Sequence, residues 1–212
     1  MPIVQTTTLK NGILGIWDIT ESKEELLHQL PFSEDEFEQF SKIKNLDKQR
    51  EKLAGRVLAK SLMDTLDETY YGIVNALSGR PVLMDSPRRV SISHSGKYVA
   101  ALITRSKTVG VDIQRIEPKI ARIAPRVLSA KELEDCDGQT AKLCAYWSIK
   151  EVLYKVYRER QLNFIDHLEI QNFILSKNCS CTGAIVLDQE RADFSVTVCT
   201  FEDYILAYHE GE

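Results

Sequence analysis

The hydrophobic and polar positions of the chain follow two periods, one typical of strands and one typical of helices. "ILGIWDIT" alternates apolar and polar residues and predicts a strand over residues 13–20. "RVSISHSG" and "YVAALIT" predict two strands that form a hairpin around Ser95, Gly96 and Lys97. Strands are predicted at residues 13–20, 89–96, 98–104, 108–116, 184–188, 193–201 and 203–208, with one short strand between turns in 78–87.

Helical periodicity marks five other segments, and most of them begin at a residue suited to capping a helix. Ser22 precedes the first, and Ser33 with Glu36 three residues later predicts a capping box for the second. The helices are predicted at residues 22–30, 33–43, 47–66, 129–136 and 141–157. In the third, a buried stripe is expected at Leu53, Val57 and either Leu62 or Met63.

The order of these elements favours an α+β fold, because strands and helices do not alternate regularly as in a doubly wound sheet. A chain of 212 residues suits one large domain or two small ones. The formal net charge of −4 gives no reason to expect nucleic-acid binding. No signal peptide and no membrane-spanning run is visible, and the five cysteines lack zinc-site spacing, so reduced thiols in a cytoplasmic protein are expected.

"VSISHSG" places a single imidazole among small residues at the end of a predicted strand. Val90, Ile92 and His94 share one face of that strand, whereas Ser91 and Ser93 share the other. A lone histidine in this position is commonly structural, and a functional role depends on the rest of the chain.

Three further residues carry chemistry that packing does not require. Asp112, in "GVDIQ", is flanked by β-branched residues that are expected to be buried while it faces the other way; it is either a turn cap or an oxygen ligand for a divalent cation. Glu151 and Lys155 lie one turn apart, opposite the apolar face of the last predicted helix. They form either a surface ion pair or part of a site.

Taken together, these residues suit phosphoryl chemistry on a pyrophosphate, which needs carboxylates for Mg²⁺, a lysine for developing charge and further groups for peripheral phosphates. The inventory is Asp112, Glu151, Lys155, His94, Ser91, Ser93 and Arg80. The motifs "GRPVL", "SISHSG", "VGVDIQ" and "WSIKEVLYK", in this order over roughly residues 50–160, resemble the 4′-phosphopantetheinyl transferases of the larger, surfactin-synthetase-activating type.

The resemblance implies a pseudo-dimer of two similar α/β halves, here residues 1–104 and 105–212, with the active site in the cleft between them. It implies transfer of the phosphopantetheine arm of coenzyme A to a serine of an apo acyl or peptidyl carrier protein, with release of 3′,5′-ADP, by a cytoplasmic monomer that uses Mg²⁺. Asp112 and Glu151 would hold the metal, Lys155 would steady the pyrophosphate, and Glu151 would be the base. The 3′-phosphate would be met by His94, Ser93 and Arg80, and by Lys42, Lys44 or Arg50.

Gln114 departs from the family pattern, since many members carry Glu there, and the lost charge is expected to weaken metal binding. This departure leaves open a non-catalytic homologue that binds carrier protein or coenzyme A. An unrelated metal phosphohydrolase is a second alternative.

Residues 115–131 are expected either to dock the acidic carrier or to form a solvated face. Their basic side chains are Arg115, Lys119, Arg122, Arg126 and Lys131. No nucleic acid or membrane partner is expected.

Overall fold

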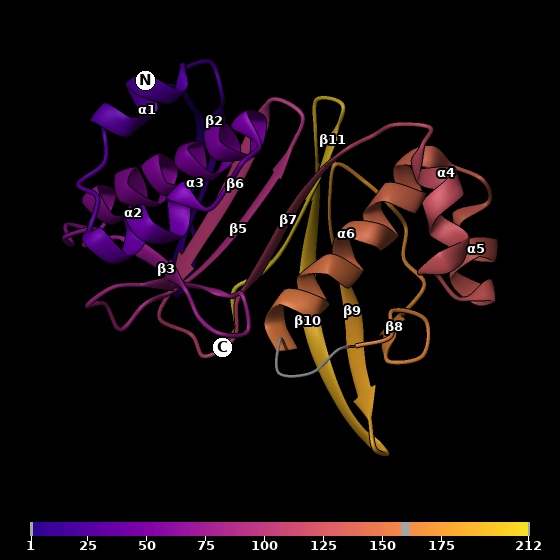
Figure 1. Ribbon diagram of the computed structural model, residues 1–212. Coiled ribbons are helices and arrows are strands. Elements are labelled where there is room, and N and C mark those ends of the chain that lie inside the picture. The colour runs from indigo at the N-terminus through magenta and orange to yellow at the C-terminus, as the bar shows by residue number, and fades with distance from the viewer. Residues whose placement is uncertain (1, 158–161, 212) are drawn as a thin grey trace. The chain divides into compact units, whose positions relative to one another are not determined.

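The computed structural model describes residues 2–157 and 162–211, and the chain divides into two compact units, one ending at Val109 and one from Gly110 to Gly211. The boundary expected after residue 104 lies just before this point. Both units combine antiparallel strands with helices, so the expected mixed fold without regular βαβ alternation is confirmed (Figure 1).

The first unit is a four-stranded antiparallel sheet in the order β1-β2-β6-β5, packed against helices. Its strands are β1 (Ile3–Thr8), β2 (Gly12–Asp18), β5 (Arg89–Ser95) and β6 (Tyr98–Thr104), and β3 (Ile73–Asn75) pairs separately with β4 (Pro81–Leu83). Its helices are α1 (Lys23–His28), α2 (Glu34–Ser41) and α3 (Leu46–Thr65). The hairpin of β5 and β6 is confirmed, whereas β1 and β3 were not predicted.

Helix α3 supplies most of the helical side of this core. Leu53, Val57, Leu62 and Met63 are all buried there, as the helical stripe predicted. Strand β2 comes close to the helix at Gly15, where an added Cβ would lie 2.9 Å from side-chain atoms of α3.

The caps of the first two helices differ in one instructive way. Ser22 forms a complete capping box with Glu25 at the start of α1. Ser33 accepts a hydrogen bond from the Glu36 amide at the start of α2, but the Glu36 side chain does not return to the cap. It points into the interior instead, so the expected capping box of α2 is wrong in its second half.

The second unit is a five-stranded antiparallel sheet in the order β7-β11-β10-β9-β8. Its strands are β7 (Gly110–Arg115), β8 (Leu168–Ile170), β9 (Asn178–Leu187), β10 (Glu190–Phe201) and β11 (Tyr204–His209). Its helices are α4 (Ile120–Ile123), the 3₁₀ turn η1 (Ala124–Arg126), α5 (Ala130–Cys136) and α6 (Thr140–Tyr157). Helix α6 crosses the sheet and packs on it through residues such as Ile149, Leu153 and Val156 (Figure 1).

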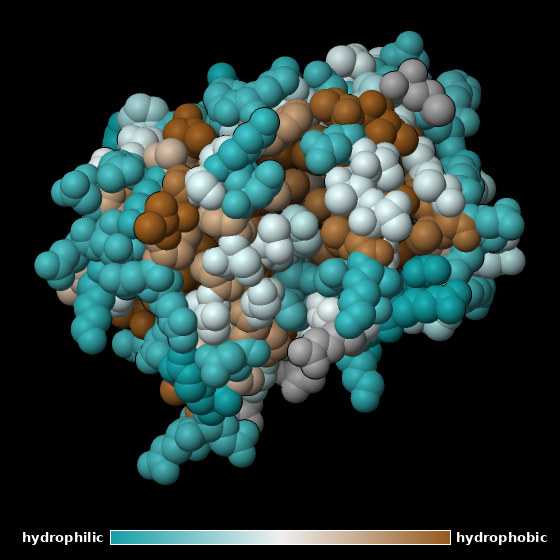
Figure 2. Space-filling model, turned by 180° about the vertical axis from the view of Figure 1, so that it is seen from behind, coloured by the Kyte–Doolittle hydropathy of each residue, from teal (hydrophilic) through white to brown (hydrophobic). Residues whose placement is uncertain are grey.

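Hydrophilic side chains cover much of the face seen in Figure 2, and hydrophobic ones show between them in separate places. Within the described residues, no helix is long and apolar enough to cross a membrane. All five cysteines are free thiols, as expected. Burial raises the pKa of the Cys136 and Cys181 thiols to about 12, so both stay protonated at neutral pH.

Candidate active site

The contact between β7 and α6 brings two of the predicted site residues together. The ammonium Nζ of Lys155 donates to the carbonyl oxygen of Val111 at 2.7 Å and to Oδ1 of Asp112 at 2.9 Å. Gly110 permits this close approach, because a Cβ there would lie only 2.6 Å from the carbonyl oxygen of Val152 on α6. The glycine of the "GVDIQ" segment therefore sets the spacing between strand and helix.

The environment of Asp112 differs from the expectation that it faces away from apolar surroundings. Its strand partner is Ala207 on β11, which belongs to the core cluster formed with α6. Because paired residues share a sheet face, Asp112 lies on the face that α6 covers. Asp112 is only 5% exposed and the Lys155 side chain 9%. The alternative of a solvated surface ion pair between Glu151 and Lys155 does not fit a lysine this buried.

Glu151 lies one helical turn before Lys155 and is half-buried. Trp147 and Tyr154 lie on α6 four residues before and three residues after it, and both rings contact Phe164, with centroids 5.9 Å and 5.5 Å from that ring. A half-buried carboxylate remains partly accessible, so it suits both metal binding and proton transfer.

Lys150, the residue before Glu151, is fully buried, and the sequence did not single it out. Its ammonium donates to Oε2 of Glu132 at 2.7 Å and to the carbonyl oxygen of Phe164 at 2.7 Å. The same Glu132 oxygen accepts from the Ser129 amide at 2.7 Å, which closes the capping box of α5. This pair ties α5 and the segment after α6 to the turn that carries Glu151. The only sequence signal for it was the lysine within "WSIKE".

Gln114 lies two residues beyond Asp112 on β7 and is partly exposed. Its side-chain amide nitrogen donates to the carbonyl oxygen of Arg115 at 3.0 Å. The hydrogen bond therefore uses the amide nitrogen of Gln114, and the side-chain oxygen is the atom that could accept a bond or bind a cation.

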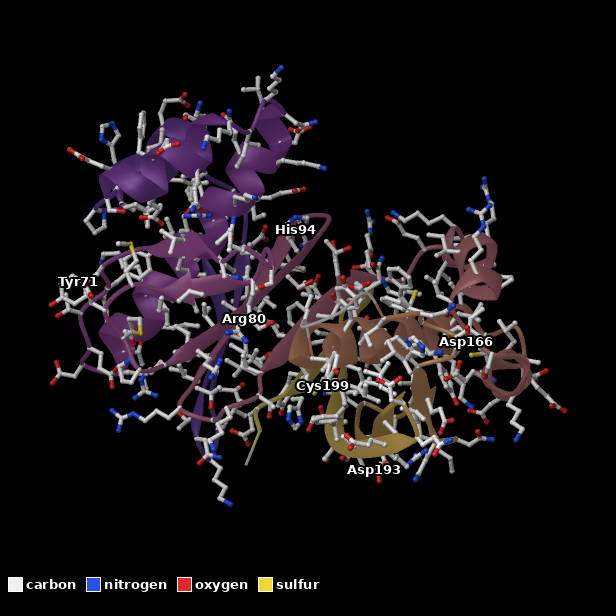
Figure 3. The ribbon with its side chains drawn as sticks, turned by 60° about the horizontal axis from the view of Figure 1, so that its bottom comes forward. Tyr71, Arg80, His94, Asp166, Asp193 and Cys199 are labelled. Atoms are coloured by element: carbon white, nitrogen blue, oxygen red, sulfur yellow. The ribbon has the colours of Figure 1, made fainter. Side chains whose placement is uncertain are left out.

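In the first unit, His94 lies near the end of β5 (Figure 3), and Ser93 precedes it on the same strand. Val90 and Ile92, on the same strand face as His94, pack toward the core with α3, as the alternation predicted. The imidazole Nε2 of His94 lies 3.1 Å from Oε2 of Glu51 on α3. The sequence did not indicate this carboxylate neighbour.

Arg80 lies in the turn between β3 and β4 (Figure 3), and a buried ion pair holds the start of β3, at the other end of this hairpin. Oε1 of Glu36 accepts from Nε of Arg56 at 2.8 Å, from the Tyr70 hydroxyl at 3.2 Å and from the Ile73 amide at 3.0 Å. Glu36 is 0% exposed and Arg56 6%. Desolvation and the Glu36 charge raise the pKa of Tyr70, so its hydroxyl remains a donor. The interior role of Glu36 explains the incomplete cap of α2.

Two of the three other basic candidates, Lys42 and Arg50, have partners in this structure. Lys42 forms an exposed ion pair with Glu38 at 2.7 Å. Arg50 donates to the carbonyl oxygens of Glu21 at 2.8 Å and Ile19 at 2.6 Å. Lys44 is exposed. Lys42 and Arg50 would need to exchange or share their present contacts to bind a phosphate.

The donor set of the second unit fits Mg²⁺ in a phosphate site. Among the described residues, no group of three or more His, Cys, Asp and Glu side chains could hold a metal. Mg²⁺ at phosphate-transfer sites is commonly held by one or two carboxylates while substrate phosphates provide further oxygens. Asp112 and Glu151 meet that requirement in kind and number.

Comparison with known proteins finds a family that resembles one segment of this chain. Residues 108–209 match the family model of the 4′-phosphopantetheinyl transferase superfamily. The resemblance expected from the motifs is confirmed for this segment, which contains Asp112, Gln114, Glu151 and Lys155. His94, Ser93, Arg80, Lys42 and Arg50 lie outside it.

Two relatives bear the same activity in their names. The chain is 32% identical over 112 residues to the 4′-phosphopantetheinyl transferase Sfp of Bacillus subtilis, which covers 49% of this chain and 50% of that protein. It is 32% identical over 111 residues to the 4′-phosphopantetheinyl transferase AcpT of Salmonella typhi, covering 49% of this chain and 56% of that protein. The chain thus spans about half the length of the curated relatives it matches.

Proposed function

We propose that this chain transfers the 4′-phosphopantetheine arm of coenzyme A to a serine hydroxyl of an acyl or peptidyl carrier protein and releases 3′,5′-ADP. The observation that carries the proposal is the contact of Lys155 with Asp112, on the helix that also bears Glu151. All three residues fall within the segment that matches the superfamily.

Asp112 and Glu151 would hold Mg²⁺, and the side-chain oxygen of Gln114 is available to the same ion directly or through water. When bound, the ion supplies positive charge to the pyrophosphate oxygens. The amide of Gln114 brings no charge, so this site relies on two carboxylates.

The chain's own groups account for the remaining chemistry. Glu151 would take the proton of the carrier serine while the serine oxygen forms a bond to the β-phosphorus of coenzyme A. The bond from that phosphorus to the bridging oxygen breaks, and 3′,5′-ADP leaves with the electron pair. Lys155, held against Asp112 before the substrate arrives, would donate to the phosphate oxygens as negative charge develops.

Residues of the first unit would recognise the nucleotide end of coenzyme A. His94, Ser93 and Arg80 would meet the 3′-phosphate and its surroundings, and Lys42, Lys44 or Arg50 would supplement them. The turn of Arg80 is closed by backbone hydrogen bonds from the Ala76 amide to the Arg80 carbonyl at 2.9 Å and from the Gly79 amide to the Ala76 carbonyl at 2.8 Å. This supports the role, because a guanidinium on a fixed hairpin loses less conformational entropy on binding than one on a free loop.

The larger type of this family, with two similar halves, is part of the proposal. Each unit has one long helix packed across an antiparallel sheet: α3 on β1-β2-β6-β5 and α6 on β7-β11-β10-β9-β8. We also propose a cytoplasmic monomer, and the free thiols support that location.

The carrier would dock on residues 115–131. Arg122 and Arg126 are exposed there beside Ile123, which is 37% exposed. Basic groups around an apolar residue suit the acidic surface of carrier proteins.

The test is incubation of the chain with coenzyme A, Mg²⁺ and a panel of apo carrier proteins, followed by intact mass measurement. A gain of the phosphopantetheine mass on serine is expected for the wild type and is expected to be lost in Glu151→Gln. The matched control is Asp166→Asn, which removes an exposed carboxylate from the same unit (Figure 3) and should keep full activity. Coenzyme A binding without transfer to any carrier would support the non-catalytic homologue instead, and free phosphopantetheine without a carrier would support a phosphohydrolase.

A further inference from the structure

A close contact between α3 and β5 places a carboxylate beside His94. Gly55 faces Ile92, and an added Cβ would lie 3.0 Å from the Ile92 Cγ2 atom. Glu51 lies one helical turn before Gly55, and His94 lies two residues beyond Ile92 on the same strand face. The missing side chain at Gly55 therefore allows Glu51 to reach His94, and Nε2 of His94 lies 3.1 Å from Oε2 of Glu51.

This contact occupies the nitrogen of His94 that lies farther from the backbone. Nε2 carries at most one hydrogen, and that hydrogen forms one strong bond at a time. A phosphate that approaches the outer end of the imidazole must therefore displace Glu51 or share the hydrogen with it. Both side chains are accessible enough to rearrange, since His94 is 45% and Glu51 26% exposed.

We infer that Glu51 is a specificity-determining residue that competes with the 3′-phosphate of the donor for His94, and this inference rests on the function proposed above. A donor with the 3′-phosphate brings further negative charge next to the Glu51 carboxylate, whereas a donor without it does not. Glu51 therefore narrows the difference in affinity between coenzyme A and dephospho-coenzyme A. The subsite accepts pantetheine donors of both kinds with less discrimination than His94 alone would give.

The test uses two small probes that need no carrier protein: adenosine 3′,5′-bisphosphate and adenosine 5′-phosphate. Their dissociation constants are measured by calorimetry for the wild type, Glu51→Gln and Glu51→Ala. Glu51→Gln keeps the size of the side chain and removes its charge, and Glu51→Ala also removes the acceptor. Both variants should bind the 3′,5′-bisphosphate about tenfold more tightly, since a charge at this distance in a half-exposed site has roughly that effect. Binding of the 5′-phosphate should stay within about twofold.

Two controls separate this effect from a general change of charge. Asp64→Asn removes one carboxylate from the same helix, where Asp64 pairs with Lys60 at 2.8 Å. It lies about 20 Å farther along the helix and should leave the preference unchanged. In a His94→Ala background, Glu51→Gln should lose most of its selective gain, because the shared hydrogen is gone.

The inference would be overturned if Glu51→Gln left the preference for the 3′,5′-bisphosphate over the 5′-phosphate unchanged. Weaker binding of the 3′,5′-bisphosphate would also overturn it, because it would mean that Glu51 orients His94 for the phosphate. Equal tightening of both probes would also overturn it. In each of these cases transfer to a carrier protein can still be observed, so the proposed function stands. If no variant binds either probe and no carrier is modified, the proposed function falls and this inference with it.

Discussion

The buried pair of Lys150 and Glu132 gives the sharpest prediction for stability. Glu132→Gln preserves the shape of the side chain but removes the counter-ion of an ammonium that is 0% exposed. The Phe164 carbonyl, at 2.7 Å, remains as the other acceptor for Lys150. A carbonyl satisfies one hydrogen but does not neutralise the charge, so the variant contains a buried cation without its anion.

The free-energy cost of Glu132→Gln depends on whether Lys150 keeps its proton in the folded variant. Breaking a buried ion pair from one side costs about 3–5 kcal/mol. Alternatively Lys150 loses its proton, and discharging a lysine of ordinary pKa at pH 7 costs about 5 kcal/mol. We therefore expect Glu132→Gln to lower the free energy of unfolding by about 3–5 kcal/mol at pH 7.

The dependence on pH follows from the pKa of Lys150, which desolvation already lowers in the wild type despite the partner Glu132. Without Glu132 the pKa of Lys150 in the folded protein falls further. At pH values between this lowered pKa and the ordinary lysine pKa, the unfolded chain binds more protons than the folded one. Stability then rises with pH across that range. The penalty of Glu132→Gln should consequently be smaller at pH 9 than at pH 7.

Urea denaturation of the wild type, Glu132→Gln, Lys150→Met and the double variant at both pH values tests this reasoning. The double variant should be more stable than Glu132→Gln alone, because it contains no buried unpaired charge. Asp203→Asn breaks an exposed pair with Arg115 in the same unit and should change stability little. A penalty below about 1 kcal/mol for Glu132→Gln, or one that does not fall with pH, would refute the argument.

Three further predictions concern other parts of the chain. Two arginines, Arg88 and Arg105, lower the pKa of Glu68 to about 2, so its contribution to folding stability is present above about pH 4.5 and is lost as the pH falls toward 2. Glu68→Gln should therefore lower the free energy of unfolding by about 1–2 kcal/mol at pH 7 and by almost nothing at pH 2, as measured by denaturation at both values. Gly110→Ala should cost about 1–3 kcal/mol, because its Cβ would meet the Val152 carbonyl, and an unchanged melting temperature would contradict this. Charge reversal at Arg122 and Arg126 should raise the KM for the carrier but not for coenzyme A, and an unchanged carrier KM would move the docking surface elsewhere.

Sequence patterns predicted the long elements well, because burial of one face leaves a clear period. Helices α3 and α6 begin and end within a residue or two of the predicted bounds, and the hairpin of β5 and β6 has the predicted turn. The missed strands lack such a signal. Strand β1, "IVQTTT", is an edge strand with mostly exposed residues, and β8 has three residues. Their pairing depends on the neighbouring strand rather than on their own composition.

The candidate site was predictable where two residues share one helix and not where the partner comes from another element. Spacing alone put Glu151 and Lys155 on the same side of α6. The neighbours of His94 and Lys150 are glutamates on other elements, Glu51 and Glu132. Glu51 belongs to no local pattern that would distinguish it from a surface residue, and the capping box that includes Glu132 does not indicate its ion pair with Lys150.

The side of β7 on which Asp112 lies shows a general limit of predicting exposure from alternation, and it changes how the site must be tested. Alternation identifies a solvent face only when one side of a strand is exposed, but β7 buries Val111 and Ile113 on one face and Asp112 on the other. Asp112→Asn therefore removes the counter-ion of a lysine that is 9% exposed, and it should lower the free energy of unfolding as well as activity.

Loss of transfer in Asp112→Asn is for that reason weak support for a metal ligand. Glu151 is half-buried, so Glu151→Gln should leave stability nearly unchanged while it abolishes transfer even at high Mg²⁺, because added metal does not replace a proton acceptor. Denaturation and transfer measured on the same preparations distinguish the two effects. If Glu151→Gln destabilised the fold as much as Asp112→Asn, or if high Mg²⁺ restored its activity, Glu151 would not be the base.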